Sequence, residues 1–588
     1  MVFHFAMGFF PVALHRIDRL YSISPPRGST RISDRETNIP CGIHDDVKRK
    51  MKKITIRIVL IWTVIFVLYG GLRYHTFLNS FAHDEGLFLY GGQAWSAGQL
   101  PYRDFWDHKP PGVFFFHSLP LRFFPFSLTA IKLHEIVWLS CSASILFVFC
   151  RRRMRPETSV LATLFYIFFT SMPYTIRAGG LTEESALFFV VLCFWLMLRS
   201  RGKLRWNCFF AGLALGTAVE FRQTYVFTFV FLIGALLHNA HQRGKKFRDV
   251  FRPFLTMCVG LALPEVIISV YFLAHGAWRN YMEASYLFNF YYIGPARHSM
   301  PLADVFYKQW MFISKTGPYL FAPLLALSTW KWIPRTTRWM LLPLILAYLG
   351  DLIAISLSGE YYEHYYVQAS VSTCLLLALF WEGLFTRLQL AWNNGLFRFP
   401  SMVFCVYALF LLALVAHFFA GGLRTYIGDY RAICEKRGSP EGEYAFQHGV
   451  AEAVQSLTDP EETILLIGRD PNSVYLLAER YAGARFYHFS PLWKDKLSGA
   501  VKEIHRQAFL QDVRDKAPVV LLIDLKKRGV IDRFLPEFQA YIDEHYIPLE
   551  DLVDEIPTDK WFWYDAWLQF QIRKDKTEMI PTRWKRSL

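Results

Sequence analysis

Residues 51–71, MKKITIRIVLIWTVIFVLYGG, indicate the kind of fold that this chain adopts. A basic flank opens the segment, and the apolar run after it is close to the roughly 20 residues that cross a bilayer as a helix. Similar runs recur along the 588 residues, of which 53% are hydrophobic, 17% aromatic and only 19% charged. So much apolar surface excludes disorder for the bulk of the chain. It favours a polytopic α-helical membrane protein over a soluble one.

About eleven membrane-spanning helices are predicted from these runs, at roughly 20 residues for each. They lie near residues 54–72, 129–150, 157–174, 182–199, 206–221, 223–239, 253–274, 311–330, 338–357, 365–385 and 401–420. The pair on either side of Glu220 and Arg222 could instead be a re-entrant hairpin, and Arg222 could simply extend toward the membrane surface.

Membrane topology accounts for the net charge of +15. Lys and Arg gather in alternate connections between the apolar runs, at 151–155, 199–205, 243–248 and 331–338. Such clusters mark cytoplasmic loops, whereas a protein that binds nucleic acid would gather them in a soluble domain. The other connections and the C-terminal region are therefore expected outside, and an odd number of spans agrees with this orientation.

Three regions are predicted. Residues 1–50 differ from the rest and are either a disordered cytoplasmic tail or an extension from an over-long gene assignment. Residues 51–428 form the transmembrane domain. Residues 429–588 are soluble in character, and we expect them to form an extracytoplasmic α/β domain.

The C-terminal region alternates strand and helix patterns. Buried strands are expected at 463–468 and 518–524, because each is a short apolar run. Helices are expected at 472–481 and 531–546, and a final antiparallel strand within 561–572. The alternation predicts a largely parallel sheet. The role of this domain stays open between acceptor recognition and structural capping.

The first outer loop, residues 73–128, has the densest group of ionisable side chains. It contains residues 81–90 (FAHDEGLFLY) and 97–112 (AGQLPYRDFWDHKPPG). Charges of both signs at a membrane surface are a candidate site by default, and the aromatic content argues against a merely solvated loop. The candidates are Asp84, Glu85, Arg103, Asp104, Asp107, His108 and Lys109. A helix that lies at the membrane interface is expected to follow the Asp-Glu pair.

These two motifs resemble bacterial members of the GT-C glycosyltransferase superfamily, related to the protein O-mannosyltransferases and the aminoarabinose transferases. The resemblance covers nearly all of residues 52–575. It continues, in order, through 180–184 (GLTEE), 212–216 (GLALG), 222–224 (RQT) and 362–366 (YEHYY). It implies a GT-C-like fold in the bacterial cytoplasmic (inner) membrane. It also implies an enzyme that moves a sugar from a polyprenyl-phosphate-linked donor to a lipid, cell-envelope glycan or protein on the outer face.

The family's presumed residue roles map onto this sequence. Asp84 would be the catalytic base of an inverting displacement, with Glu85 beside it, because an acceptor hydroxyl must lose its proton to a carboxylate. Lys109 would bind the donor phosphate, whose charge grows as it leaves. The residues themselves, apart from the resemblance, indicate two further candidate phosphate ligands, because a guanidinium can bind phosphate with two hydrogen bonds. They are Arg103 and Arg297, and the outer loop 275–310 that contains Arg297 could instead be merely structural.

Supporting roles in the site are expected for six residues. They are Asp104, Asp107, His108, Glu183, His364 and Tyr365. The alternatives are that Glu183 only favours the start of a helix and that the His-Tyr pair only anchors the chain at the interface.

The cofactor is left unknown, with a divalent metal as an open question. Aminoarabinose transferases have a Glu directly before the phosphate-binding lysine, and that Glu takes part in a metal site. This chain has His108 there, after Asp107. Either side chain could bind a metal, but the sequence names no complete ligand set.

Two other classes of function compete with a glycosyltransferase. A transporter or flippase for a lipid-linked glycan would have ionisable residues near the membrane midplane and inverted repeats, whereas these charges lie in outer loops and no repeat is evident. A sensor with a ligand-binding outer domain would not explain the ionisable groups at 83–109. The expected partners are therefore the donor, the acceptor and membrane lipids, without nucleic acid.

Overall fold

The computed structural model describes residues 41–588 apart from 80, 82, 125–126, 199–203, 294–300, 358, 395–398, 439–442, 469–472, 489, 494–498, 526–528, 530, 532, 534, 554–567, 583 and 585–588. The chain divides into two compact units, Met1–Val59 and Leu60–Leu588. The candidate site and the C-terminal sheet both lie within the second unit. The predictions for residues 1–40 fall outside the described residues.

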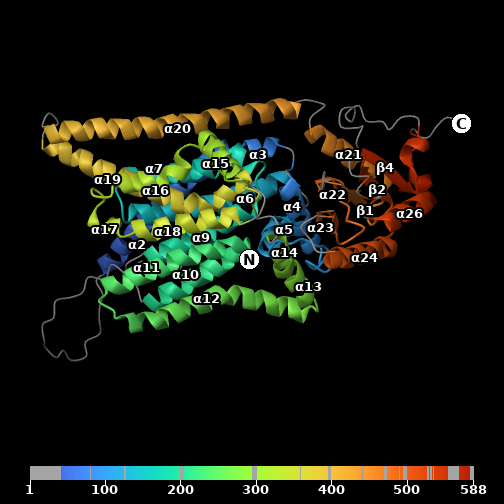
Figure 1. The fold of residues 1–588 in the computed structure, drawn as a ribbon, viewed down its shortest axis with the longest axis horizontal. Coiled ribbons are helices and arrows are strands. Elements are labelled where there is room, and N and C mark those ends of the chain that lie inside the picture. Colours follow the sequence, from blue (N-terminus) through green and yellow to red (C-terminus); the bar gives the residue numbers. More distant parts are fainter. Residues whose placement is uncertain are drawn as a thin grey trace. The chain divides into compact units, whose positions relative to one another are not determined.

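The described part of the chain from Cys41 to Gly438 is mainly helical (Figure 1). Its elements are α2 (Cys41–Leu72), α3 (His75–Leu78), α4 (His83–Ser96), α5 (Gly112–Phe123), α6 (Leu128–Arg151), α7 (Pro156–Phe169), α8 (Pro173–Ile176), α9 (Thr182–Leu198), α10 (Leu204–Val219), η1 (Gln223–Thr228), α11 (Phe229–Gln242), α12 (Phe247–Ala274), α13 (Trp278–Met282), η2 (Glu283–Leu287), α14 (Phe288–Ile293), α15 (Leu302–Thr316), η4 (Pro318–Phe321), α16 (Ala322–Ser328), α17 (Arg335–Arg338), α18 (Leu341–Ser356), η5 (Glu363–Ala369), α19 (Ser370–Asn393) and α20 (Phe399–Gly438).

Seven helical segments in the described part of the chain are long and apolar enough to cross a membrane. They are Thr55–Leu72, Leu128–Arg151, Gln223–Gln242, Arg248–Ala274, Arg335–Ser356, Glu363–Asn393 and Ser401–Arg437. The prediction of a multi-pass α-helical membrane protein is therefore confirmed. The remaining predicted spans coincide with shorter helices such as α7 and α10, so the count of eleven stays a prediction.

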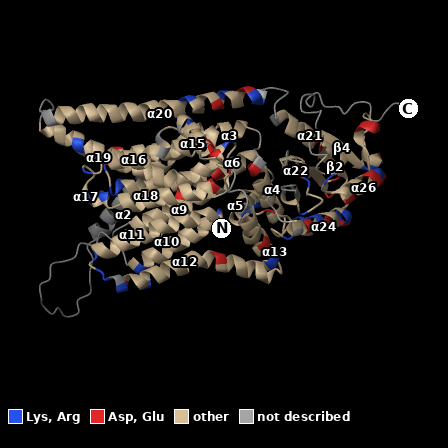
Figure 2. Cartoon of the chain, in the orientation of Figure 1, with Lys and Arg blue, Asp and Glu red and all other residues tan. Residues whose placement is uncertain are grey.

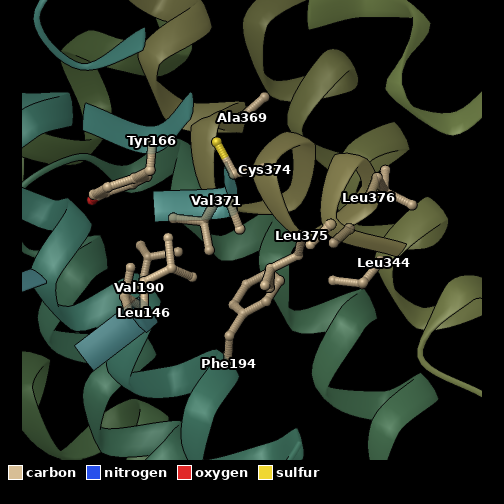
Figure 3. Close-up of a cluster of buried hydrophobic side chains, with 14 of the residues drawn as sticks. Leu146, Tyr166, Val190, Phe194, Leu344, Ala369, Val371, Cys374, Leu375 and Leu376 are labelled. Atoms are coloured by element: carbon tan, nitrogen blue, oxygen red, sulfur yellow. The ribbon is translucent and has the colours of Figure 1, made fainter. Parts of the chain in front are cut away.

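The core of the helical part lies where α6, α7, α9, α18 and α19 meet (Figure 3). Leu146, Tyr166, Val190, Phe194 and Val371 are fully or almost fully buried there. In a membrane, lipid tails are as apolar as these side chains, so the helices associate through close packing rather than through a hydrophobic driving force.

The 212–216 motif (GLALG) has a packing role. A Cβ atom at Gly212 or Gly216 would meet the backbone carbonyls of Met257 or Leu261 on α12, and one at Gly260 would meet Phe209 on α10. Small residues four apart let two helix backbones approach this closely in a membrane. The motif therefore explains how α10 and α12 pair, and it contributes no group to the site.

The C-terminal region contains a four-stranded sheet (Figure 1). Its elements are α21 (Glu443–Leu457), β1 (Ile464–Ile467), α22 (Ser473–Leu477), α23 (Ser490–Trp493), α24 (Gly499–Lys516), β2 (Val520–Asp524), α26 (Pro536–His545), β3 (Tyr546–Pro548), η7 (Leu549–Asp551), β4 (Leu568–Arg573) and η9 (Lys574–Met579). The strand order is β1-β2-β4-β3. The β1 and β2 strands run parallel, and β4 is antiparallel to both β2 and β3.

The prediction of a largely parallel sheet is wrong, because only one of these pairs is parallel. The strands at 463–468 and 518–524 correspond to β1 and β2, and the antiparallel final strand corresponds to β4. The first part of that strand, 561–567, lies outside the described residues. The three-residue β3 was missed because it follows α26 directly and is too short to show an alternating pattern.

Candidate active site

The Asp-Glu pair of the first loop lies in the first turn of α4. Consecutive residues of a helix point in different directions, and here the two carboxylates have opposite surroundings. The Asp84 side chain is 39% exposed, and its Oδ2 lies 3.7 Å from Nε2 of His364. Glu85 is completely buried and forms an ion pair with Lys132 on α6. Asp84 is therefore accessible to solvent, whereas Glu85 is part of the packed interior.

Glu85 belongs to a buried charge network. The network comprises Arg73, Glu85, Lys132, Glu135 and Glu184, none of them more than 4% exposed. Nη1 of Arg73 lies 2.5 Å from Oε1 of Glu184, and Oε2 of Glu135 lies 3.6 Å from Nη2 of Arg73 and 3.7 Å from Nζ of Lys132. Buried charges persist only when they are paired in this way. The network therefore ties the start of α4 to α6 and α9.

Sequence reasoning missed Arg73, Lys132 and Glu135. Two of them lie three residues apart within the predicted span 129–150, where ionisable residues are rare and normally paired or functional. That spacing within an apolar run was a signal for the buried network.

The loop before α9 approaches the network closely because it contains two glycines. Gly179 and Gly180 have φ angles of 88° and 71°, which favour glycine. A Cβ atom at Gly180 would lie 3.1 Å from both Cγ of Glu85 and Oε1 of Glu135. The 180–184 motif thus combines a tight loop with the two glutamates that begin α9.

A second set of charged groups lies near the exposed carboxylate of Asp84. Oε1 of Glu183 is 3.8 Å from Nε2 of His364 and 2.5 Å from Nη1 of Arg222. The Arg222 guanidinium lies over the ring of Tyr365, 4.3 Å from its centre. The structure therefore brings together Asp84, Glu183 and the His-Tyr pair of η5. It also adds Arg222, which pairs with Glu183 instead of extending toward the membrane surface.

The backbone of the 107–109 segment is held by hydrogen bonds to two side chains. Oδ1 of Asp107 accepts a hydrogen bond from the backbone N–H of Lys109 at 2.9 Å, and the Lys109 carbonyl accepts one from the Tyr102 hydroxyl at 2.8 Å. Nζ of Lys109 lies 3.0 Å from Nε2 of His108. Burial raises the pKa of Asp107, an effect that the Lys109 ammonium opposes and the Asp84 carboxylate reinforces. The two motifs of the first loop thus belong to one electrostatic environment.

Arg103 and Asp104 form a pair with each other. Nε and Nη2 of Arg103 each donate a 2.8 Å hydrogen bond to the Asp104 carboxylate. Burial alone would raise the pKa of Asp104, but the hydrogen bonds from Arg103 and from the Leu100 backbone hold that pKa below its usual value. Arg103 thus makes its bidentate hydrogen bond to the Asp104 carboxylate and not to a phosphate. Arg297 lies outside the described residues, so both phosphate assignments stay predictions.

The candidate metal ligands of the first loop are engaged by proton donors. Oδ1 of Asp107 faces the Lys109 N–H at 2.9 Å and Nδ1 of His108 at 3.5 Å, while Nε2 of His108 faces Nζ of Lys109. Across the described part of the chain, no three His, Cys, Asp or Glu side chains are grouped as metal ligands. This arrangement does not fit a metal site.

Comparisons with known proteins identify a matching family model and similar solved structures. A family described as dolichyl-phosphate-mannose-protein mannosyltransferase matches residues 108–271, which include the 180–184 and 222–224 motifs. No curated protein sequence matches the chain.

The fold is similar to that of ArnT from Cupriavidus metallidurans. The apo crystal structure has a TM-score of 0.53 and 12% sequence identity, and the structure bound to undecaprenyl phosphate has a TM-score of 0.52 and 10% identity. Each comparison covers 88% of this chain and 98% of the other. At such identities the likeness shows a shared fold. The predicted resemblance to GT-C glycosyltransferases is therefore confirmed, and the roles of individual residues stay predictions.

Proposed function

We propose that this protein is a membrane glycosyltransferase that moves a sugar from a polyprenyl-phosphate donor to a hydroxyl group of a lipid, glycan or protein. The observation that carries the proposal is the exposure of Asp84. It is an accessible carboxylate, whereas Glu85 and Asp107 are buried and the half-buried Asp104 is paired with Arg103. The undecaprenyl phosphate bound by ArnT, which has the same fold, supports a donor of this class.

The reaction is a displacement at the anomeric carbon. Asp84 takes the proton of the acceptor hydroxyl as its oxygen bonds to that carbon, and the bond from the carbon to the phosphate oxygen breaks. The electron pair of that bond leaves with the lipid phosphate, where Lys109 stabilises the added charge. The new bond forms on the face opposite the leaving group, so the configuration at the anomeric carbon is inverted. Glu183, held by Arg222, orients His364 beside the base.

We place the reaction on the outer face of the cytoplasmic membrane, with the C-terminal domain on the same side. The long helices are mostly free of charge along their length (Figure 2). The basic clusters 151–155 and 243–248 follow the C-terminal ends of α6 and α11, whereas Asp84 and Glu183 lie at the N-terminal ends of α4 and α9. Basic clusters favour the cytoplasm, which supports an outer location for the acidic site.

A transfer assay tests the proposal. Purified protein in lipid vesicles is incubated with radiolabelled undecaprenyl-phosphate sugars and with membrane extracts that supply acceptors. We expect label to move into an acceptor and free undecaprenyl phosphate to appear in equal amount. Movement of intact donor from one leaflet to the other, without transfer, would identify a flippase and contradict the proposal. Heat-denatured protein is the control for non-enzymatic release.

Lys109→Ala is expected to weaken the binding of undecaprenyl phosphate and to slow transfer. A hydrogen bond to a charged group contributes about 1.5–3 kcal/mol, which corresponds to a loss of roughly ten- to a hundredfold. Lys109→Arg should keep part of both activities, because it retains the charge but changes its geometry. Arg103→Ala tests the second candidate ligand in the same loop, and we expect it to have a smaller effect, because this cation is engaged by Asp104. Full activity of the Lys109→Ala protein would remove this residue from the mechanism.

A further inference from the structure

We infer that the C-terminal domain positions the phosphate-binding lysine through residues 482–488, which we term the docking segment. The inference rests on the proposed function, because it concerns the geometry around Lys109. It gives the C-terminal domain a specific role, where the sequence had left acceptor recognition and structural capping as alternatives. The connection from the domain to Lys109 runs through Trp106 and Asp107.

The docking segment is bonded to the first loop at its backbone. The N–H of Trp106 donates a 2.8 Å hydrogen bond to the carbonyl of Arg485, and the N–H of Ala482 donates one of 2.9 Å to the hydroxyl of Tyr90 on α4. The Tyr487 hydroxyl lies 3.2 Å from the carbonyl of Leu87, and its single proton is shared between that carbonyl and Asp107. The C-terminal domain therefore holds both motifs of the first loop, the helix that carries Asp84 and the stretch before Lys109.

Asp107 joins the docking segment to Lys109. Its Oδ2 lies 3.4 Å from the Tyr487 hydroxyl and 3.7 Å from Nε2 of His488. Its Oδ1 accepts the hydrogen bond from the backbone N–H of Lys109. Burial raises the pKa of the Tyr487 hydroxyl well above its usual value, so this group stays a hydrogen-bond donor. One buried carboxylate thus contacts the domain with one oxygen and fixes the lysine with the other.

The docking segment is itself held in place by the rest of the domain. Nε and Nη2 of Arg485 each donate a 2.7 Å hydrogen bond to Asp512 on α24, and the Arg485 N–H donates a third at 2.9 Å. The Trp106 ring is nearly fully buried against the rings of Phe486 and His488. Because aromatic packing and paired charges both resist displacement, a shift of the domain would be transmitted to the 106–109 stretch.

Two variants of the docking segment test the inference, with binding of undecaprenyl phosphate as the readout. Tyr487→Phe removes one hydroxyl while keeping the ring, and His488→Ala removes the imidazole. We expect Tyr487→Phe to raise the Kd for undecaprenyl phosphate about tenfold, the loss of one hydrogen bond to a charged group. We expect a smaller rise for His488→Ala, because Nε2 of His488 lies 3.7 Å from Asp107, beyond hydrogen-bond distance. Tyr481→Phe, a tyrosine of the same domain just before the docking segment, is the matched control and should bind normally.

A double-mutant cycle separates positioning from a general loss of stability. If Tyr487 acts through Asp107, the Kd of the Tyr487→Phe/Asp107→Ala protein should equal that of Asp107→Ala alone, because alanine removes the carboxylate that joins the two groups. Multiplicative effects, or a normal Kd for Tyr487→Phe, would overturn the inference while leaving the proposed function standing. Failure of the unsubstituted protein to bind undecaprenyl phosphate would overturn both. Should His488→Ala fail to fold, the conservative Tyr487→Phe result decides.

Discussion

The Asp84→Asn protein is expected to fold, to insert into the membrane and to bind undecaprenyl phosphate, yet to transfer sugar about 10²–10⁴-fold more slowly than the unsubstituted protein. The substitution keeps the size of the side chain and much of its hydrogen bonding, but removes the basicity that the acceptor hydroxyl needs. The Asp84 side chain is 39% exposed, so its replacement leaves no buried charge without a partner. Single-turnover transfer measured beside donor binding would separate the two effects.

The competing explanation of Asp84 is that it only favours the start of α4. An amide serves almost equally well at a helix N-terminus, so near-normal turnover of Asp84→Asn would support that structural role. The base would then be sought at Asp107 or Glu183. Glu183→Gln is the useful comparison, because Glu183 shares the His364 contact but is buried against Arg222. We expect it to retain more activity than Asp84→Asn if Glu183 only positions its neighbours.

The helix after the Asp-Glu pair could be predicted because its cause is local. Apolar and aromatic residues at Tyr90, Ala94 and Trp95 recur at helical spacing, and the observed α4 covers all three. The membrane-spanning helices could be predicted for the same reason, because each is indicated by one continuous apolar run. Each spans about 20 residues, and each coincides with one or more observed helices.

The sequence could not predict that Asp84 would be exposed and Glu85 buried. They depend on Lys132, which is 47 positions further along the chain, and no local pattern determines which face of α4 that lysine meets. Arg222 is a similar case, because the carboxylate that holds it lies on α9, well before it in the chain. In both cases the partner is chosen by helix packing.

Arg103 shows that residue type alone does not determine which partner a side chain contacts. Its guanidinium suits a phosphate, but its nearest carboxylate is the next residue, and two short hydrogen bonds engage it there. The sheet was misjudged for a related reason. Alternation of strands and helices favours parallel pairing, yet the last strand in the chain, β4, enters the sheet between β2 and β3. Strand order reflects contacts across the whole domain.

Lys132→Met is expected to destabilise the protein strongly, lowering the free energy of unfolding by about 3–5 kcal/mol. The buried charge network has two cations, Arg73 and Lys132, for the three carboxylates of Glu85, Glu135 and Glu184. Methionine has a similar length and suits the apolar surroundings, so little packing is lost. The cost arises because Glu85 loses its ion pair and stays buried. Thermal and denaturant unfolding in detergent would measure it.

The companion variant Lys132→Met/Glu85→Gln makes this prediction specific. Removing both charges of a buried pair costs much less than removing one, because the balance of charge in the network is then unchanged. The double variant should therefore recover part of the lost stability, and Lys132→Arg, which keeps the charge, should be milder than Lys132→Met. If the double variant were less stable than Lys132→Met, Glu85 would have to be stabilised by something other than Lys132. If both stability and transfer recover in the double variant, the buried charge network acts by holding α4 in place. The fixed helix then positions Asp84.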